Sequence, residues 1–122
     1  MSGIRYLADT NAFVYLLEGH ELILQLAQFD WAFSYITEIE LLSKKNIIGT
    51  EELLIKTLLK RCRRINHNQE ITQEAITIRR NYGLKLPDAI IAASGLVFDL
   101  PILTADSDFS KVAELDILLI QP

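Results

Sequence analysis

The chain has 122 residues, of which 50% are hydrophobic and 23% charged, and its formal net charge is −4. This composition suits one globular domain with one hydrophobic core and excludes a disordered or low-complexity chain. Cys62 is the only cysteine, so no intramolecular disulfide can form, and the longest uncharged run, residues 89–98, is well short of the ~20 residues of a membrane span.

Strand-like and helix-like patterns alternate along the chain. In chain order, the sequence predicts a strand at 4–9, helices at 12–19 and 21–29, a strand at 31–36, helices at 38–45 and 50–61, a strand at 62–67, helices at 72–82 and 88–98, a strand at 100–106, a helix at 107–115 and a strand at 116–121. This alternation predicts an α/β fold with a twisted, mostly parallel sheet and helices on both faces.

Several predicted helix ends carry capping residues. Thr10 or Asn11 is the predicted N-cap of the first helix, and Thr37 and Thr50 are the predicted N-caps of the third and fourth. Gly83 is the predicted end of the helix before it.

The composition leads us to expect a single domain over residues 1–122, without a membrane segment. No secretion signal is recognisable at the start of the sequence, so we expect the protein in the cytoplasm.

Four acidic residues stand where the predicted strands end or the predicted helices begin. Asp9 and Asp106 end two strands, Glu40 lies in the first turn of the helix after the second strand, and Asp88 begins the helix at 88–98. In open α/β sheets ligands bind beyond the carboxyl ends of the strands. Each acid alone also suits a capping, turn or surface role, but capping does not require four separate segments to meet at one edge.

Converging carboxylates indicate a hard divalent cation. They repel one another, and some would stay protonated at neutral pH unless a cation neutralised them. Mg²⁺ and Mn²⁺ prefer oxygen ligands, and such ions activate water and stabilise charge on a transferring phosphoryl group. Zinc is not expected, because His20 and His67 are isolated and no other cysteine accompanies Cys62.

The charge is distributed unevenly along the chain. Residues 44–85 contain ten basic and four acidic residues, a net charge of +6, whereas the rest has two basic and twelve acidic residues, a net charge of −10. This asymmetry suits an anion-binding wall beside an acidic centre, although solvated helix faces would give the same counts.

The sequence resembles the PIN-domain ribonucleases, and among them the small VapC-like toxins of toxin–antitoxin pairs. Four segments in order carry the resemblance: "YLADTNAFVYLLEG", "SYITEIELL", "LPDAIIAA" and "ILTADSDF". They are similar to the opening strand with Asp-Thr-Asn, the Ser-x-x-Thr-x-x-Glu-Leu segment, the Asp-Ala-x-Ile-Ala-Ala helix and the closing Leu-Thr-x-Asp/Asn…Asp-Phe of that family. The resemblance runs nearly end to end and implies the PIN-like fold.

The resemblance also implies roles for individual residues. The acidic, catalytic and metal-binding quartet would be Asp9, Glu40, Asp88 and Asp106, with Asp108 a further metal ligand. Thr10 and Asn11 would orient Asp9, and Thr104 would support the loop that carries Asp106. The choice of Glu40 over Glu38 rests on the resemblance, because the apolar pattern of this helix favours neither.

The implied activity is metal-dependent hydrolysis of single-stranded RNA with Mg²⁺ or Mn²⁺, leaving a 3′-hydroxyl and a 5′-phosphate. The candidate contacts to the RNA backbone are Arg61, Arg63, Arg64, Arg79, Arg80 and Lys85. The implied partners are a second copy of the chain and an antitoxin protein, for which the apolar segment 13–29 is a candidate contact surface.

Three rival functions remain to be weighed. A haloacid-dehalogenase-type phosphatase would have a second Asp two residues after Asp9, where this chain has Asn11. A receiver domain would have an acidic pair after the first strand, which is missing. The remaining alternative is a non-catalytic PIN-like scaffold that binds RNA or protein, and the presence of all four acids argues against it.

Overall fold

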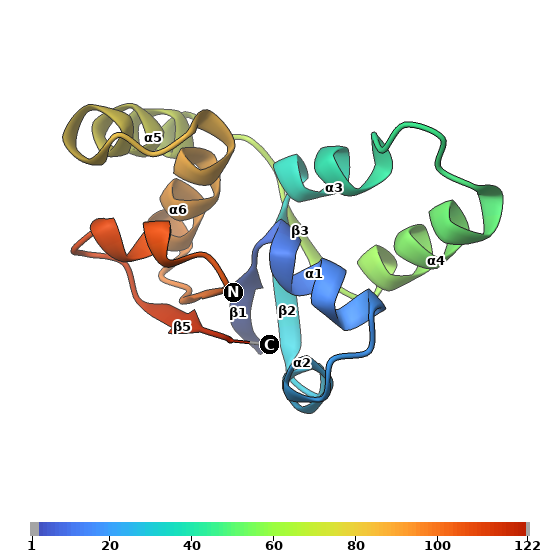
Figure 1. The fold of residues 1–122 in the computed structure, drawn as a ribbon. Coiled ribbons are helices and arrows are strands. Elements are labelled where there is room, and N and C mark those ends of the chain that lie inside the picture. The colour runs from blue at the N-terminus through green and yellow to red at the C-terminus, as the bar shows by residue number, and fades with distance from the viewer. Residues whose placement is uncertain (1–2, 122) are drawn as a thin grey trace.

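The computed structural model of the chain describes residues 3–121, in which a five-stranded sheet is flanked by helices (Figure 1). The strands are β1 (Ile4–Ala8), β2 (Asp30–Ser34), β3 (Arg63–Ile65), β4 (Ile102–Thr104) and β5 (Ile117–Leu119). The helices are α1 (Thr10–Leu17), α2 (Glu21–Leu26), α3 (Tyr35–Leu42), α4 (Gly49–Lys60), α5 (Gln69–Tyr82) and α6 (Leu86–Phe98), followed by the 3₁₀ turn η1 (Ser107–Lys111).

The sheet is parallel throughout, with the strand order β3-β2-β1-β4-β5. The chain first builds outward from the central β1 through β2 to β3, and then returns to the other side of β1 to add β4 and β5. The predicted α/β fold with a parallel sheet is therefore confirmed. The reversal of direction places a topological switch point between β1 and β4, where α/β sheets bind their ligands.

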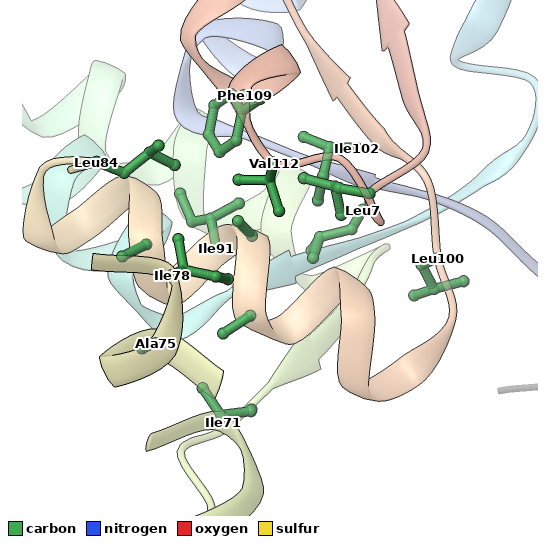
Figure 2. Packing of buried hydrophobic residues seen from close by; sticks show 14 of the residues in the cluster. Leu7, Ile71, Ala75, Ile78, Leu84, Ile91, Leu100, Ile102, Phe109 and Val112 are labelled. Carbon is green, nitrogen blue, oxygen red and sulfur yellow. The ribbon is translucent and has the colours of Figure 1, made fainter. Parts of the chain in front are cut away.

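Helices cover both faces of the sheet because successive strand residues point to opposite sides. Leu7 packs into a buried cluster with the residues of α5, α6 and η1, which include Ile78, Ile91 and Phe109 (Figure 2). The adjacent Ala8 belongs to a second cluster, on the side of α1, α2 and α4. Strands that are buried on both faces explain the continuous apolar runs in the sequence. Within residues 3–121, no helix has the length and apolar character that a bilayer span requires.

The first helix begins with a different cap from the predicted one. The side chain of Asp9, rather than that of Thr10 or Asn11, accepts the Ala12 N–H at 3.0 Å. Thr10 and Asn11 are the first two residues of α1. Their side chains are therefore free for contacts outside the helix, which bears on the site described below.

Two further predicted caps are wrong. Helix α3 begins at Tyr35, capped by Ser34, so Thr37 is a buried residue inside the helix and Glu40 lies in its second turn. Helix α4 follows Ile48, without a side-chain cap, and Thr50 is inside it.

The helix predicted at 72–82 begins earlier, at Gln69, because the side chain of Asn68 caps it. Its end at Gly83 is confirmed, with the glycine at φ 68° in the left-handed region. The helix predicted at 107–115 is the shorter 3₁₀ turn η1.

Candidate active site

Asp9 lies directly after the central strand β1 and is only 3% exposed. One carboxylate oxygen accepts the Ala12 N–H, and the other, Oδ2, accepts the Thr104 hydroxyl at 2.5 Å. The side-chain amide of Asn11 lies 3.5 Å from the same Oδ2. The carboxylate is therefore held in one orientation by the first turn of α1 and by Thr104 at the end of β4.

Thr104 joins β1 to β4 across the switch point. While its hydroxyl donates to Asp9, its oxygen accepts the backbone N–H of Asp106 at 2.9 Å. The Asp106 carboxylate in turn accepts the Asp108 N–H at 2.9 Å and caps η1. A single buried hydroxyl thus fixes both the Asp9 side chain and the loop that carries Asp106.

The structure separates the two glutamates of α3. Thr10 donates its hydroxyl to Glu40 Oε1 at 2.6 Å, and the Thr10 and Thr37 hydroxyl oxygens lie 3.1 Å apart. Glu40 is thereby tied to the first residue of α1, next to Asp9. This contact favours Glu40 as the glutamate of the site, as the resemblance implies.

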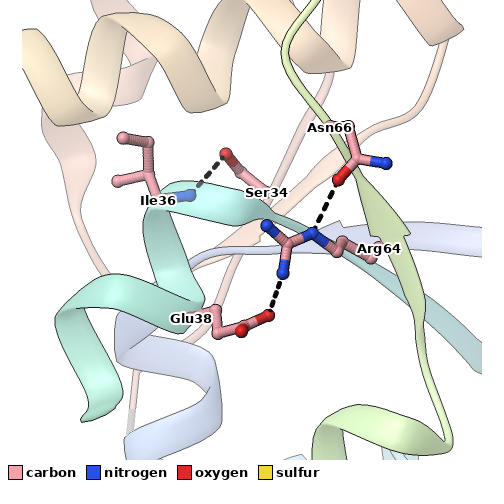
Figure 3. Close-up of polar contacts among 5 residues, drawn as sticks. All are labelled: Ser34, Ile36, Glu38, Arg64 and Asn66. Atoms are coloured by element: carbon pink, nitrogen blue, oxygen red, sulfur yellow. Dashed lines mark hydrogen bonds and ion pairs between the residues drawn. The ribbon is translucent and has the colours of Figure 1, made fainter.

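Glu38 points toward the other side of α3, where it forms an ion pair with Arg64 of β3 (Figure 3). The Arg64 Nε also donates to Asn66 Oδ1 at 2.6 Å. The sequence did not reveal this ion pair, since its members are 26 residues apart and nothing in the spacing links them.

The acidic residues lie close enough together to alter one another's protonation. Burial and, to a smaller extent, the charges of Asp88 and Asp106 together raise the pKa of Asp9 to about 6, against the opposing hydrogen bonds from Thr104 and Ala12. Burial also raises the pKa of Asp88, as do the nearby carboxylates of Asp106, Glu40 and Asp108, while Lys85 lowers it. Carboxylates from four segments thus share one electrostatic environment at the carboxyl edge of the sheet.

This donor set fits a hard divalent cation. Its ligand atoms are all oxygens, and the mutual repulsion that raises the pKa values of Asp9 and Asp88 is what a bound cation would relieve. Among residues 3–121, no three His, Cys, Asp or Glu side chains are already arranged to hold a metal ion. The four acids therefore lie at one edge of the sheet, but their side chains do not form a complete coordination shell.

The predicted RNA-contacting residues are spread over several elements. Lys85 immediately precedes α6 and lies close enough to Asp88 to lower its pKa. Arg79 and Arg80 are exposed in the last turn of α5. Lys85 is the candidate that the structure brings nearest to the acids.

The other candidates lie around β3 and α4. Arg63 is exposed on β3, and Arg64 on the same strand is engaged by Glu38. Arg61 lines a cavity of about 580 Å³ between α1, α4 and the start of β2, together with Trp31 and Leu58. This cavity lies at the amino end of β2, away from the carboxylates.

The comparisons with known proteins agree with this architecture. A family model described as PIN domain matches residues 6–115. In a solved toxin–antitoxin complex from Klebsiella pneumoniae, one chain is 30% identical to this one, with a TM-score of 0.79 and coverage of 93% of this chain and 95% of that chain. A comparison with curated proteins gives no match.

Two further solved structures show the same fold at lower identity. One is VapBC2 from Rickettsia felis bound to a DNA fragment from its promoter, with 17% identity, a TM-score of 0.86 and coverage of 97% of this chain and 100% of that chain. The other is DNA-bound VapBC from Salmonella typhimurium, with 17% identity, a TM-score of 0.85 and coverage of 94% of this chain and 97% of that chain. With a family model that spans most of its length, this chain belongs to the PIN domain family.

Proposed function

We propose that this protein is a metal-dependent endoribonuclease. Nuclease activity is the class that membership of the PIN domain family implies. The observation that carries the proposal is the shared environment of four acids from separate segments at the switch point, where Asp88 experiences the charges of Asp106 and Glu40, and Asp9 those of Asp88 and Asp106. The ligands of Mg²⁺ or Mn²⁺ would be Asp9, Glu40, Asp88 and Asp106, with Asp108 beside them.

The chain's own residues prepare this site. Thr104 and the Ala12 N–H hold the Asp9 carboxylate in place, and Thr10 orients Glu40. When bound, Mg²⁺ or Mn²⁺ supplies an activated water and stabilises the charge that develops on the phosphodiester. Lys85 lies close enough to Asp88 to lower its pKa, and it would bind a phosphate of the RNA beside the cleaved bond.

Single-stranded RNA is the substrate form that we propose. Bases of a single strand can be splayed apart, which lets a phosphodiester reach the recessed Asp9. The flanking phosphates would contact the exposed arginines of β3 and α5, namely Arg63, Arg79 and Arg80.

We further propose that the protein is the toxin of a toxin–antitoxin pair and forms homodimers, in the cytoplasm. The relative from Klebsiella pneumoniae is part of a toxin–antitoxin complex, and so are the VapBC structures. The cavity between α1 and α4 has a mixed lining whose apolar part includes Leu16 and Phe29 of the segment 13–29. Leu22 and Leu24 on α2 are also exposed, which supports this segment as the antitoxin contact.

Cleavage of an RNA pool tests the proposed activity. A mixture of single-stranded and structured RNA would be incubated with Mn²⁺ and the wild type, with Mn²⁺ and Asp9→Asn, or with the wild type and EDTA. Asparagine is also a good N-cap, so Asp9→Asn keeps the start of α1 while removing the charge. We expect cleavage only in the reaction that contains the wild type and Mn²⁺, and none with Asp9→Asn or with EDTA.

Two results would contradict the assignment. Full activity of Asp9→Asn would show that cleavage does not use this site. Absence of cleavage together with absence of Mn²⁺ binding would favour the non-catalytic scaffold.

A further inference from the structure

An aromatic pair lies at the same edge of the sheet as the acids and has no part in the site described above. Tyr35 is the first residue of α3, directly after β2, and His67 follows β3 by two residues. Their ring centroids are 6.4 Å apart and the ring planes are at 84°, an edge-to-face arrangement. Tyr35 is half-buried and His67 is exposed.

The strand register places this pair beside the carboxylates. Leu7 is paired with Ala32, which puts Asp9 at the level of Ser34, and Ser34 is itself paired with Ile65. Neighbouring strands are ~4.8 Å apart, so the ends of β2 and β3 lie about 5 Å and about 10 Å from the end of β1. The aromatic pair thus extends the site along the edge toward β3.

The pair is partly accessible, since His67 is exposed and Tyr35 half-buried. In an edge-to-face pair, the ring that offers its edge keeps both of its faces clear of the partner ring. The Thr72 hydroxyl of α5 lies 3.2 Å from Nε2 and 3.5 Å from Nδ1 of His67, so the imidazole also has a polar neighbour. Just before His67 in the chain, Arg64 pairs with Glu38 of α3 and donates to Asn66 (Figure 3).

We propose that Tyr35 and His67 form a base-stacking site for single-stranded RNA, adjacent to the phosphate that the acids engage. The proposal rests on the proposed function, since it names a contact of the same substrate. Aromatic rings next to basic residues are the means by which proteins bind single strands, and stacking accepts any base because every base has a π-face. This site would set the position of the strand on the protein without selecting a sequence.

The chain offers a matched control in a second Tyr–His pair. Tyr15 and His20 have centroids 5.0 Å apart and planes at 84°, but they lie at the far end of α1 from Asp9. His20 also lies 3.3 Å from Glu18, an acid that disfavours RNA. Substitutions in this pair remove the same chemistry at a place away from the acids.

The test measures RNA affinity in the Asp9→Asn background, in which the strand is bound and not cut. Fluorescence anisotropy of a short labelled single-stranded RNA would be compared for Tyr35→Ala, Tyr35→Phe, His67→Ala, Tyr15→Ala and His20→Ala, with the melting temperature of each variant. We expect Tyr35→Ala to weaken binding about tenfold, the effect of one lost stacking contact. Tyr35→Phe, Tyr15→Ala and His20→Ala should bind as the parent does, and His67→Ala should bind more weakly.

Duplex RNA separates stacking from charge, because paired bases offer no free face. Tyr35→Ala should therefore leave duplex affinity unchanged. Equal single-strand affinity of the parent, Tyr35→Ala and His67→Ala would overturn the proposal, and so would failure of the parent to bind the single strand. If Tyr35→Ala does not fold, the exposed His67→Ala decides alone. If Tyr35→Ala and His67→Ala lose affinity for the single strand but the wild type does not cleave RNA, the stacking site is supported and the nuclease activity is rejected.

Discussion

At the scale of single residues, the most unusual group is the buried carboxylate of Asp9. A buried charge is costly unless it is paired or bound to a cation, and this one has no cationic partner among its hydrogen bonds, which come from Ala12, Thr104 and, at 3.5 Å, Asn11. Burial consequently raises the pKa of Asp9 to about 6. The site is therefore built at a cost in stability that a bound cation would offset.

This cost predicts a pH dependence of folding in the absence of metal. Since the folded pKa of Asp9, about 6, exceeds the ordinary value of 3.8, the folded protein holds, between these two pH values, a proton that the unfolded chain has released. The free energy of unfolding should therefore fall as the pH rises from about 4 to about 6, by an amount on the order of 3 kcal/mol. Asp9→Asn has no such proton to lose. Urea unfolding of both proteins in EDTA measures the difference, and parallel pH profiles would contradict the buried carboxylate.

Thr104 gives a second prediction at this scale. It is fully buried, and Thr104→Val keeps its shape while leaving Asp9 Oδ2 without its short hydrogen bond and the Asp106 N–H without an acceptor. We expect a loss of about 1–3 kcal/mol in the free energy of unfolding and weaker Mn²⁺ binding. Thr104→Ser keeps the hydroxyl and is the control. Equal Mn²⁺ affinities of the two variants would mean that Thr104 does not orient Asp9.

The sequence predicted the strand-end acids Asp9 and Asp106 because the strand pattern itself ends at them. It could not choose between Glu38 and Glu40, because the choice depends on partners far away in the chain. Thr10 reaches Glu40 and Arg64 reaches Glu38 only after the strands have paired. Such contacts are tertiary and leave no local signal.

At the scale of elements, α6 brings Asp88 to the sheet edge by packing very closely on β4. A Cβ added at Gly95 would lie 2.8 Å from Ile102 Cδ1, 3.0 Å from the Leu100 carbonyl oxygen and 3.2 Å from Leu115 Cδ1. The tip of Ile102 could move aside, but the Leu100 carbonyl belongs to the backbone that follows α6, so an added Cβ would require this segment to shift.

Gly95→Ala is therefore expected to destabilise the protein by about 1–3 kcal/mol through overpacking, although alanine is the better helix former by up to ~1 kcal/mol. Gly49→Ala is the matched control, since Gly49 also lies in a helix and an added Cβ would meet nothing within 4 Å. Thermal unfolding of both variants tests this. If the two variants unfold at the same temperature, α6 can move away from β4 without a loss of stability, and the prediction is wrong.

The order and type of the elements could be predicted, and several of their ends could not. The apolar period distinguishes strand from helix, but Ser34 and Thr37 are both favoured cap residues, and the pattern does not say which of them the helix follows. The structure uses Ser34 because β2 ends there. Thr37 is thereby released to contact Thr10. The end at Gly83 was predictable since the left-handed conformation favours glycine strongly.

At the scale of the whole molecule, the parallel sheet brings acids from separate segments of the chain to one edge. Residues far apart in sequence meet because all strands point the same way and the strand order reverses beside β1. The basic segment 44–85 supplies α4, β3 and α5, and its last residue, Lys85, lies beside the acidic centre. This combination suits a polyanion that must be held by cationic side chains while a metal acts on one phosphate.

The most direct measurement of the central claim is a calorimetric titration of the metal-free protein with Mn²⁺, comparing the wild type with Asp88→Asn and Asp99→Asn. The two aspartates lie at opposite ends of α6, and asparagine tolerates the left-handed conformation of position 99. Asp88→Asn should weaken Mn²⁺ binding at least about tenfold, the effect of losing a charged ligand worth about 1.4 kcal/mol or more. Asp99→Asn should bind like the wild type. Binding that is equal in all three proteins, or absent from the wild type, would contradict a metal site at the carboxyl edge of the sheet.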